Sequence, residues 1–213
     1  YLSGLHILDV LKSGVIKGSG RAIGRKALVV FQFSISIILI AATWLVQAQM
    51  EFVQQKNLGY DRDNVIYFER EGTLLEKSDE FLVALKTIPT VEKASTSGFM
   101  IGGANATEGV RWAGKSDDER ITFWETKFGI GAIETLNIEV TEGRSFSEDF
   151  NSDKESIILN ETAIRVMGLE NPIGKTVEHY SGSKKIIGIV KDFNMLSLHT
   201  QIEPSFFLLE PEQ

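Results

Sequence analysis

The feature that most constrains this chain of 213 residues is a run of 24 residues without a charged side chain, from 27 to 50. Its apolar part, 27–48, would form a helix about 33 Å long, and the hydrocarbon core of a bilayer is about 30 Å thick. A cleaved signal peptide has a shorter apolar region, of about 7–15 residues, and a small-residue cleavage site that is missing after Val46. A buried helix of a soluble domain is the other alternative, but runs of about 18 or more apolar residues are typical of membrane spans. We therefore predict an uncleaved transmembrane helix over 27–48.

The charges on either side of the run indicate its orientation. Residues 1–26 carry five basic side chains and one acidic side chain, whereas residues 51–213 carry 17 basic and 28 acidic side chains, a net charge of −11. Short basic flanks of a span stay on the cytoplasmic side. We expect 1–26 to be a cytoplasmic juxtamembrane segment and the chain from about 51 onward to lie in the periplasm, with the span in the cell inner membrane. The first segment has the pattern of an amphipathic helix, with apolar positions Leu5, Leu8, Leu11 and Val15.

Four polar side chains share one face of the predicted span, because Gln32, Ser36, Thr43 and Gln47 are spaced 4, 7 and 4 residues apart. A glutamine amide that faces lipid tails is costly unless it finds a partner, and small polar residues suit close helix–helix packing. The alternative is that Gln47 already lies at the membrane interface and that the two hydroxyls bond back to their own helix. The first interpretation predicts other transmembrane helices beside this one.

Beyond the span we expect a short stalk and then an outer domain. The helix should continue as the stalk over 49–59, which includes Gln49, Phe52 and Gln54, and stop near Gly59. Residues 60–213 then form a periplasmic core domain.

The outer domain alternates strand and helix patterns. Helices are predicted over 76–88, with Ser78 as a cap and Pro89 as a stop, and over 161–167. Period-two alternation and turn residues predict strands over 64–69, 91–101, 109–113, 120–127, 138–146, 156–159, 175–178 and 184–190. The last two are separated by a Ser-Gly-Ser turn and should form a hairpin. We expect an α+β fold with a mixed, mostly antiparallel sheet and room for two lobes.

The composition and the motifs argue against several classes of function. The absence of cysteine excludes disulfides and thiolate ligands, and a net charge of −7 argues against a duplex nucleic-acid binder. The three histidines (His6, His179 and His199) have no metal-ligand spacing, and the sequence contains neither a phosphate-cradling GxxxxGK[ST] loop nor a GxSxG nucleophile elbow. The acidic clusters at 61–63 and 117–119 lack the ligand pattern of a calcium loop. We expect no catalytic residue, no cofactor and no metal site.

Six stretches taken together resemble the FtsX/MacB-like permease family of ABC transporters, in the family's order and spacing over nearly the whole chain. The stretches are LVVFQFSISIILI at 28–40, NLGYDRDNVI at 57–66, LNIEVTEGRSF at 136–146, ILNETA at 158–163, NPIGKTV at 171–177 and IIGIVKDF at 186–193. The resemblance is strongest to the long two-repeat permeases of Bacteroidota, and it implies that the span is the first helix of the second repeat. It also implies a MacB-like periplasmic core fold without catalytic residues.

Within these stretches several residues suit roles that maintain the fold. Gly143, in the Glu-Gly-Arg sequence that ends with Arg144, suits a tight bend at the end of a strand. Asn160 can cap the helix that follows it. Pro172 and Gly174 suit the turn into the final hairpin.

The resemblance further implies a mechanical function. Members of the family couple a cytoplasmic ABC ATPase to export, extraction or signalling outside the membrane, so 27–48 would act as a lever, 49–55 as a stalk and the outer domain as the moving load. The implied partners are the ATPase subunit, reached through parts of the permease absent from this chain, other transmembrane helices of the same permease, and the lipid bilayer. The alternative function is the sensor domain of a single-pass receptor.

Family members continue beyond the point that corresponds to Gln213, through more of the domain and three further helices. We therefore expect this chain to be a fragment, with an unpaired edge or a partner contact near 206–209.

Overall fold

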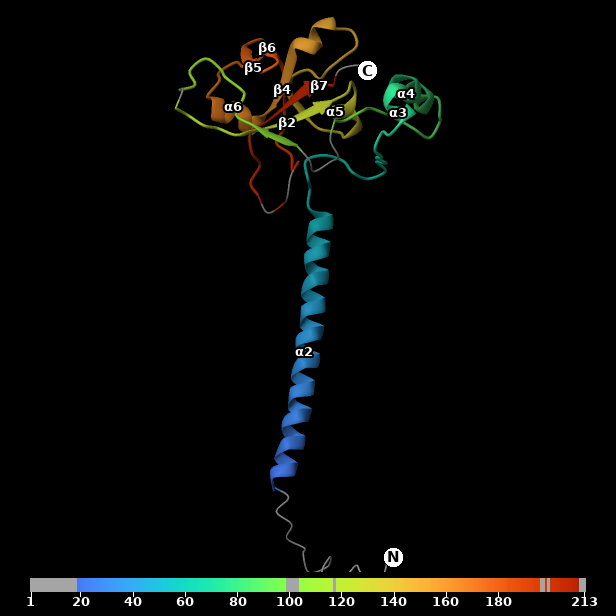
Figure 1. Ribbon diagram of the computed structural model, residues 1–213, viewed down its shortest axis with the longest axis vertical. Helices are drawn as coiled ribbons and strands as arrows, with labels where there is room; N and C mark the ends of the chain where they lie inside the picture. The colour runs from blue at the N-terminus through green and yellow to red at the C-terminus, as the bar shows by residue number, and fades with distance from the viewer. Residues whose placement is uncertain (1–18, 99–103, 117, 196–197, 199, 211–213) are drawn as a thin grey trace, which may run out of the picture. The chain divides into compact units, whose positions relative to one another are not determined.

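The computed structural model describes residues 19–98, 104–116, 118–195, 198 and 200–210 (Figure 1). The predicted amphipathic helix within 1–18 and the histidines at positions 6 and 199 lie outside these residues. The chain divides into two compact units, 1–56 and 57–213, and each is described by itself.

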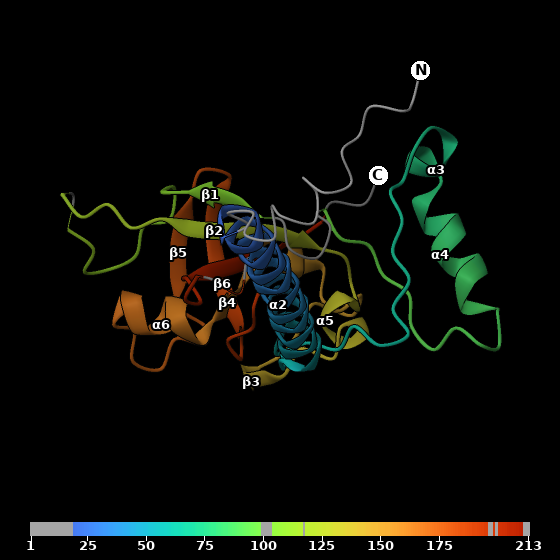
Figure 2. The ribbon, with the colours of Figure 1, turned by 90° about the horizontal axis from the view of Figure 1, so that it is seen from below.

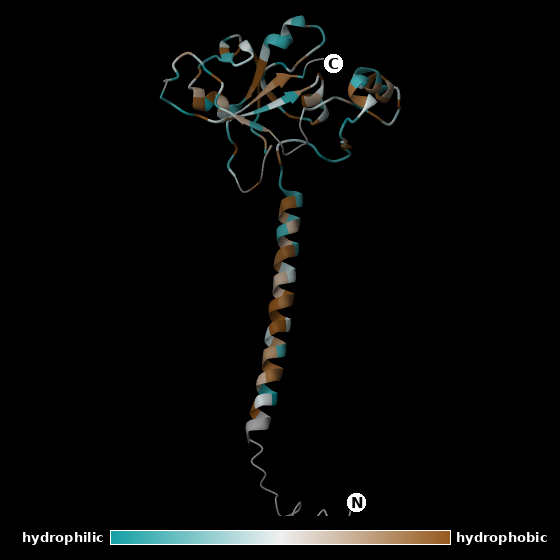
Figure 3. Cartoon of the chain, in the orientation of Figure 1, coloured by the Kyte–Doolittle hydropathy of each residue, from teal (hydrophilic) through white to brown (hydrophobic). Residues whose placement is uncertain are grey.

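The first unit is built on one long helix, α2 (Ser19–Gln55), of 37 residues. It includes the whole of the predicted span and most of the predicted stalk without interruption. From Ile23 onward every side chain on it is exposed, including Phe33 and Ile40, which are 66% and 70% exposed. Figure 3 shows the hydrophobic colour running along the middle of the helix. By length and composition, Ile23–Gln55 is the one helix among the described residues that could cross a membrane.

The second unit contains a seven-stranded mixed sheet in the part of the chain that the structure describes. The strand order is β1-β2-β7-β4-β6-β3, with β5 also paired to β6. The pairs β2·β7 and β4·β6 are parallel and the other four are antiparallel. The bounds are β1 Asn105–Thr107, β2 Phe123–Phe128, β3 Val140–Gly143, β4 Ser156–Asn160, β5 Thr176–His179, β6 Gly182–Val190 and β7 Ser205–Leu209. The prediction of an α+β fold with a mostly antiparallel sheet is therefore confirmed.

Apolar side chains on the two faces of this sheet form two cores. Alternation along β4 sends Ile157 and Leu159 into the first core and Ile158 into the second, and all three are completely buried. Helix α6 (Glu161–Met167) contributes to the first core and α5 (Ala132–Thr135) to the second. A strand buried on both faces is central in a sheet, which agrees with the place of β4 between β7 and β6.

Several predictions from local sequence patterns are confirmed. The predicted strand at 156–159 and helix at 161–167 correspond to β4 and α6. The predicted hairpin is the pair β5·β6. The extended segment predicted at 138–146 contains β3, and the one predicted at 120–127 covers β2 except for its last residue, Phe128.

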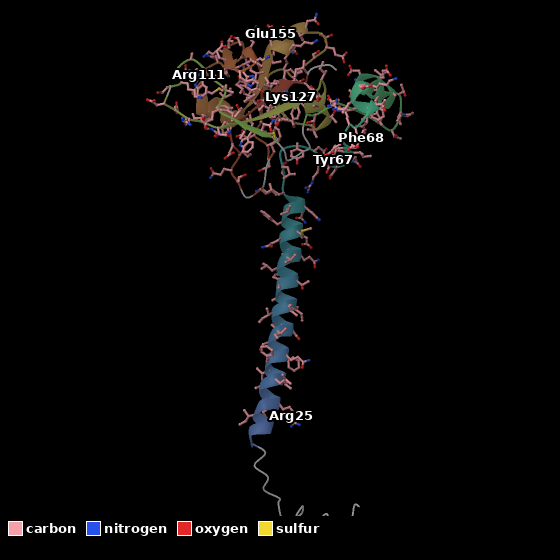
Figure 4. All side chains as sticks on the ribbon, viewed as in Figure 1. Arg25, Tyr67, Phe68, Arg111, Lys127 and Glu155 are labelled. Atoms are coloured by element: carbon pink, nitrogen blue, oxygen red, sulfur yellow. The ribbon has the colours of Figure 1, made fainter. Side chains whose placement is uncertain are left out.

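Residues 64–69, in contrast, do not form the predicted strand. They have no ladder partner among the described residues, and Ile66, Tyr67 and Phe68 are 88%, 62% and 53% exposed (Tyr67 and Phe68 are labelled in Figure 4). Alternation shows which side chains can share a face, but a strand also needs a neighbouring backbone to pair with. The segment also begins with Asn64 at a φ of 62°, a left-handed conformation that interrupts extended backbone.

Two further strand predictions are largely wrong. Within 91–98, the described part of 91–101, there is a single bridge, from Ser97 to Phe128. Within 109–113 the only pairing is a bridge from Arg111 to Glu178, while the strand that pairs with β2 lies earlier, at β1.

The predicted helix at 76–88 corresponds to α4 (Ser78–Lys86), which ends before Pro89, and a separate short helix, α3 (Thr73–Glu76), precedes it. Ser78 does not act as the N-cap. It is 6% exposed, and its hydroxyl donates back to the Leu74 carbonyl at 2.9 Å and accepts from Arg70 at 3.1 Å. Figure 2 shows α6 to the left of the strands and α3 and α4 to their right.

The expectation of an unpaired edge at 206–209 is also wrong. Strand β7 contains these residues and lies inside the sheet, parallel to β2 on one side and antiparallel to β4 on the other. Phe206 and Phe207 are completely buried on opposite faces. The apolar run of β7 is therefore that of a central strand.

Candidate functional site

The predicted packing face of α2 consists of Gln32, Ser36, Thr43 and Gln47, which project within an arc of about 60° at about 100° per residue. The Ser36 hydroxyl donates to the Gln32 carbonyl at 3.0 Å, and the Thr43 hydroxyl donates to the Leu39 carbonyl at 2.8 Å. Both hydroxyls therefore bond back to their own helix, as the alternative interpretation required. This bonding leaves the side-chain surface available for contact with another helix, so packing against a partner remains a prediction.

The predicted stalk residues Gln49, Phe52 and Gln54 occupy the last two turns of α2. The ammonium of Lys56 lies 5.8 Å from the centre of the Phe52 ring, which is itself 65% exposed. Gln47, at the start of this region, donates to Glu51 at 3.5 Å. The helix is continuous through the point where the apolar run ends and charged residues begin.

In the outer domain, Gly143 lies at the end of β3 with a φ of +74°. A Cβ atom built on Gly143 would lie 2.2 Å from the Ile187 carbonyl oxygen, so no larger residue fits without a backbone shift. The close approach sets the start of the bend that leads into Arg144.

Arg144 forms a two-pronged ion pair with Asp153, at 2.6 and 2.7 Å, and its guanidinium stacks 3.8 Å from the Phe150 ring centre. The Asp153 carboxylate is 1% exposed and also accepts from the Ser147 backbone N–H at 3.0 Å. Burial alone would raise the pKa of Asp153, but these hydrogen bonds and the charge of Arg144 outweigh it and hold the pKa below its ordinary value. The pair fastens the segment after β3 to the segment that precedes β4.

Asn160 is the N-cap of α6, where its side-chain oxygen accepts from the Ala163 N–H at 2.9 Å. The same oxygen accepts from the Ser205 N–H at 2.9 Å, and the side-chain amide donates to the Glu203 carbonyl at 3.0 Å. Sequence reasoning identified only the cap. The structure shows that Asn160 also joins α6 to the start of β7.

Pro172 and Gly174 lie in the turn before β5. The Lys175 N–H donates to the Pro172 carbonyl at 3.1 Å, and the Gly174 N–H donates to the Ile186 carbonyl at 2.8 Å. Gly174 has a φ of +87°, which favours glycine. The turn therefore starts the pairing of the β5·β6 hairpin.

A polar layer that sequence reasoning missed joins β2 to the β5·β6 hairpin through the buried Glu125 and His179 and the exposed Tyr180. The Tyr180 hydroxyl donates to the Glu125 carboxylate at 3.0 Å, and His179 Nε2 lies 3.5 Å from the same carboxylate. His179 Nδ1 lies 2.7 Å from the Ser181 hydroxyl and accepts from the Ser181 N–H at 3.3 Å, while Nε2 faces Glu125. The signal in the sequence was the alternation of β5, which places Val177 and His179 on one buried face.

Burial lowers the pKa of His179, and the neighbouring Glu125 carboxylate offsets part of this effect. Burial also raises the pKa of Tyr180, together with its hydrogen bond to Glu125 and the charge of that carboxylate. At neutral pH the layer therefore consists of a neutral imidazole, a neutral phenol and one acid. In the described ranges no group of three or more His, Cys, Asp or Glu side chains is placed to hold a metal ion.

Comparison with known proteins gives a family and a set of similar folds. A family model described as MacB-like periplasmic core domain matches residues 28–208. No curated protein matches the chain. The similar solved structures include the periplasmic region of MacB from Actinobacillus actinomycetemcomitans, at 18% identity over 62% of this chain and 54% of that chain, with a TM-score of 0.42. They also include the extracellular domain of the ABC-type transporter YknZ from Gram-positive bacteria, at 19% identity over 62% of this chain and 61% of that chain, with a TM-score of 0.43. This chain thus spans little more than half the length of the solved chains it matches.

Proposed function

The chain belongs to the family of MacB-like periplasmic core domains, and we propose that it is part of an ABC transporter permease that relays ATPase-driven motion to its outer domain. In this proposal 1–26 are cytoplasmic, α2 crosses the inner membrane and the domain from about 60 onward lies in the periplasm. The work done outside the membrane is export, extraction or signalling. The chain itself carries no catalytic group in this account, and ATP hydrolysis takes place on a separate subunit.

The continuity of α2 is the observation that carries the proposal. A relay needs a stiff connection across the boundary between lipid and water, because a flexible joint would absorb the displacement. Helix α2 runs from Ser19 to Gln55 without a break, and the charged residue Glu51 lies inside it. The apolar run therefore ends within the helix, and the same rod leads from the apolar segment into the polar one.

The proposed partners follow from the same helix. The polar face of Gln32, Ser36, Thr43 and Gln47 would pack against other transmembrane helices of the permease, since lipid offers the glutamine amides no hydrogen bond. The cytoplasmic ABC ATPase would be reached through those other helices. The exposed apolar side chains elsewhere on α2 would face the bilayer.

The relay can be tested by softening the stalk in the intact permease reconstituted with its ATPase. Inserting Gly-Gly after Gln54 introduces two residues that each cost a helix about 1 kcal/mol relative to alanine. Inserting Ala-Ala at the same point shifts the helical register equally but keeps the rod stiff, so it serves as the matched control. The readouts are the rate of ATP hydrolysis and the ATP-dependent signal of a fluorophore on Glu155→Cys, an exposed position of the outer domain labelled in Figure 4.

We expect the Gly-Gly variant to hydrolyse ATP while the fluorophore signal falls well below that of the Ala-Ala variant. Amide exchange in β4 and β6 should be unchanged in both variants, which shows that the outer domain is intact. Equal ATP-dependent signals in the two variants would contradict the relay. A sensor domain would show no response to ATP at all.

A further inference from the structure

Tyr180, one member of the polar layer, lines a pocket of about 330 Å³ in the outer domain. Lysines from three elements line it: Lys127 from β2, Lys154 from η1 (Asn151–Glu155) and Lys184 from β6. Lys127 is labelled in Figure 4. The remaining lining consists of Tyr180, Ser181, Leu208, Leu209 and Glu210. Three cationic side chains thus converge on one pocket in a domain whose net charge is strongly negative.

Lys184 is the most constrained of these cations. The residue is 9% exposed, and its ammonium donates to the Lys154 carbonyl at 2.9 Å. An ammonium has three N–H donors, and a neutral carbonyl satisfies one of them without balancing the charge. A buried charge is costly unless it is paired, so an anion beside Lys184 would lower the free energy of the site.

Two acidic side chains lie in or near the pocket wall: Glu210 lines the pocket, and Glu125 contacts the lining residue Tyr180. Glu210 binds Arg70 through one carboxylate oxygen at 2.6 Å, and its other oxygen is buried without a hydrogen bond. Glu125 accepts from Tyr180. Among the described residues no ion pair joins Lys127 or Lys184 to either acid. Burial is the main reason that the pKa of His179 is lowered, and the charges of Lys184 and Lys127 lower it further. Both cations therefore act on the same small volume.

We propose that this pocket binds a small organic anion, whose carboxylate or phosphate group is held by Lys184 and Lys127 and whose apolar part lies against Leu208 and Leu209. Its volume is at the lower end of the range of small-molecule sites, about 300–1,000 Å³. Tyr180 and Ser181 also line the pocket, while their hydroxyls contact the Glu125 carboxylate and His179 Nδ1. This inference goes beyond the relay and does not depend on it, since the pocket lies entirely within the outer domain.

The test is calorimetric titration of the intact chain in detergent, at fixed ionic strength, with four probes. Phenyl phosphate and phenylacetate share an aromatic part and differ in the anionic group, so together they distinguish a phosphate ligand from a carboxylate ligand. Inorganic phosphate lacks the apolar part, and benzyl alcohol lacks the charge. We expect saturable binding of one aromatic anion with a Kd of about 1 mM or tighter, and weaker binding of the other three probes.

Two substitutions and one matched control locate the binding. Lys127→Gln and Lys184→Gln should each weaken binding of that aromatic anion by about tenfold, the effect of losing one charge-assisted hydrogen bond. Lys86→Gln removes an exposed lysine at the end of α4 and should leave binding unchanged. Because Lys184 is buried, the thermal unfolding midpoint is measured for each variant to show that it is folded. If the Lys184→Gln variant is unfolded, the affinity of the Lys127→Gln variant tests the proposal, since Lys127 is half-exposed.

Three results would overturn the proposal. The first is no saturable heat with either aromatic anion. The second is benzyl alcohol binding as tightly as the anions. The third is an affinity that Lys127→Gln leaves unchanged in a folded protein.

Discussion

The helix α2 and the outer domain use the same apolar side chains in opposite ways. On α2, Phe33 and Ile40 are 66% and 70% exposed, whereas in the outer domain Phe206 and Ile158 are completely buried. The sheet is stabilised by excluding water from its own two cores. On α2 every side chain from Ile23 to Gln55 is exposed, and by length and composition this helix could cross a membrane. One chain thus contains a domain whose apolar side chains are buried and a helix whose apolar side chains are exposed.

The largest expected effect compares a phenylalanine from each region. Phe206→Ala should destabilise the outer domain by about 3–5 kcal/mol, because it leaves a cavity between Phe123 and His179 in the first core. That loss corresponds to a fall of roughly 10 °C in the unfolding midpoint. Phe33→Ala should leave the midpoint unchanged, since it removes an exposed ring from α2. Thermal unfolding of the outer domain in the detergent-solubilised chain gives the midpoint of each variant. Similar midpoints for the two variants would contradict the difference between the buried and the exposed phenylalanine.

A smaller effect compares two glycines. Gly143→Ala places a methyl group 2.2 Å from the Ile187 carbonyl oxygen at a φ of +74°, so we expect a loss of about 2–3 kcal/mol in unfolding free energy. Gly24, on α2, has nothing within 4 Å of an added Cβ, so Gly24→Ala should be neutral to the outer domain. Chemical denaturation followed by amide exchange in β6 distinguishes them. An unchanged stability of Gly143→Ala would show that the bend after β3 can relax.

The smallest effect is a difference in response to pH. His179 has a lowered pKa in the folded domain, so below its ordinary value of 6.5 the unfolded chain binds a proton that the folded domain does not, and stability falls as pH drops through 6.5. Asp153 also has a lowered pKa, so its ion pair stabilises the domain above the ordinary value of 3.8 and loses its effect as pH falls below that value. The apolar run of α2 contains no titratable side chain and should not respond.

Unfolding midpoints between pH 7.5 and 5 measure the first of these steps. His179→Gln should flatten the curve in this range, whereas Asp153→Asn should lower stability throughout it, because Arg144 loses its charged partner. A curve that keeps its slope in the His179 variant would assign the pH response to another group.

The sequence predicted those elements whose determinants are local. The apolar run predicted the helix α2. The Asn160 cap and the apolar pattern beside it predicted β4 and α6, and the turn residues near Gly174 and Gly182 predicted the β5·β6 hairpin. Each of these depends on residues close together in the chain. The boundaries of β4, α6 and the hairpin strands were predicted to within two residues, whereas α2 begins at Ser19, eight residues before the predicted span.

The missed features depend on contacts between distant segments. Strand β7 was expected at an edge because its apolar run does not show that β2 and β4 lie on either side of it. The alternation in 64–69 predicts a strand, but no described backbone pairs with it. The bond between Glu125 and Tyr180 joins residues 55 positions apart, and only the sheet brings them together. Non-local pairing is set by the fold as a whole, which alternation in one segment does not specify.

The most direct test of the account is the side of the membrane on which each region lies. The chain has no cysteine, so Arg25→Cys and Glu155→Cys each introduce a single thiol at an exposed position. The measurement is labelling by a membrane-impermeant maleimide in spheroplasts, before and after permeabilisation. The account predicts that the thiol at position 155 reacts before permeabilisation and the thiol at position 25 only after it. Labelling of position 25 in intact spheroplasts, with position 155 protected, would contradict it.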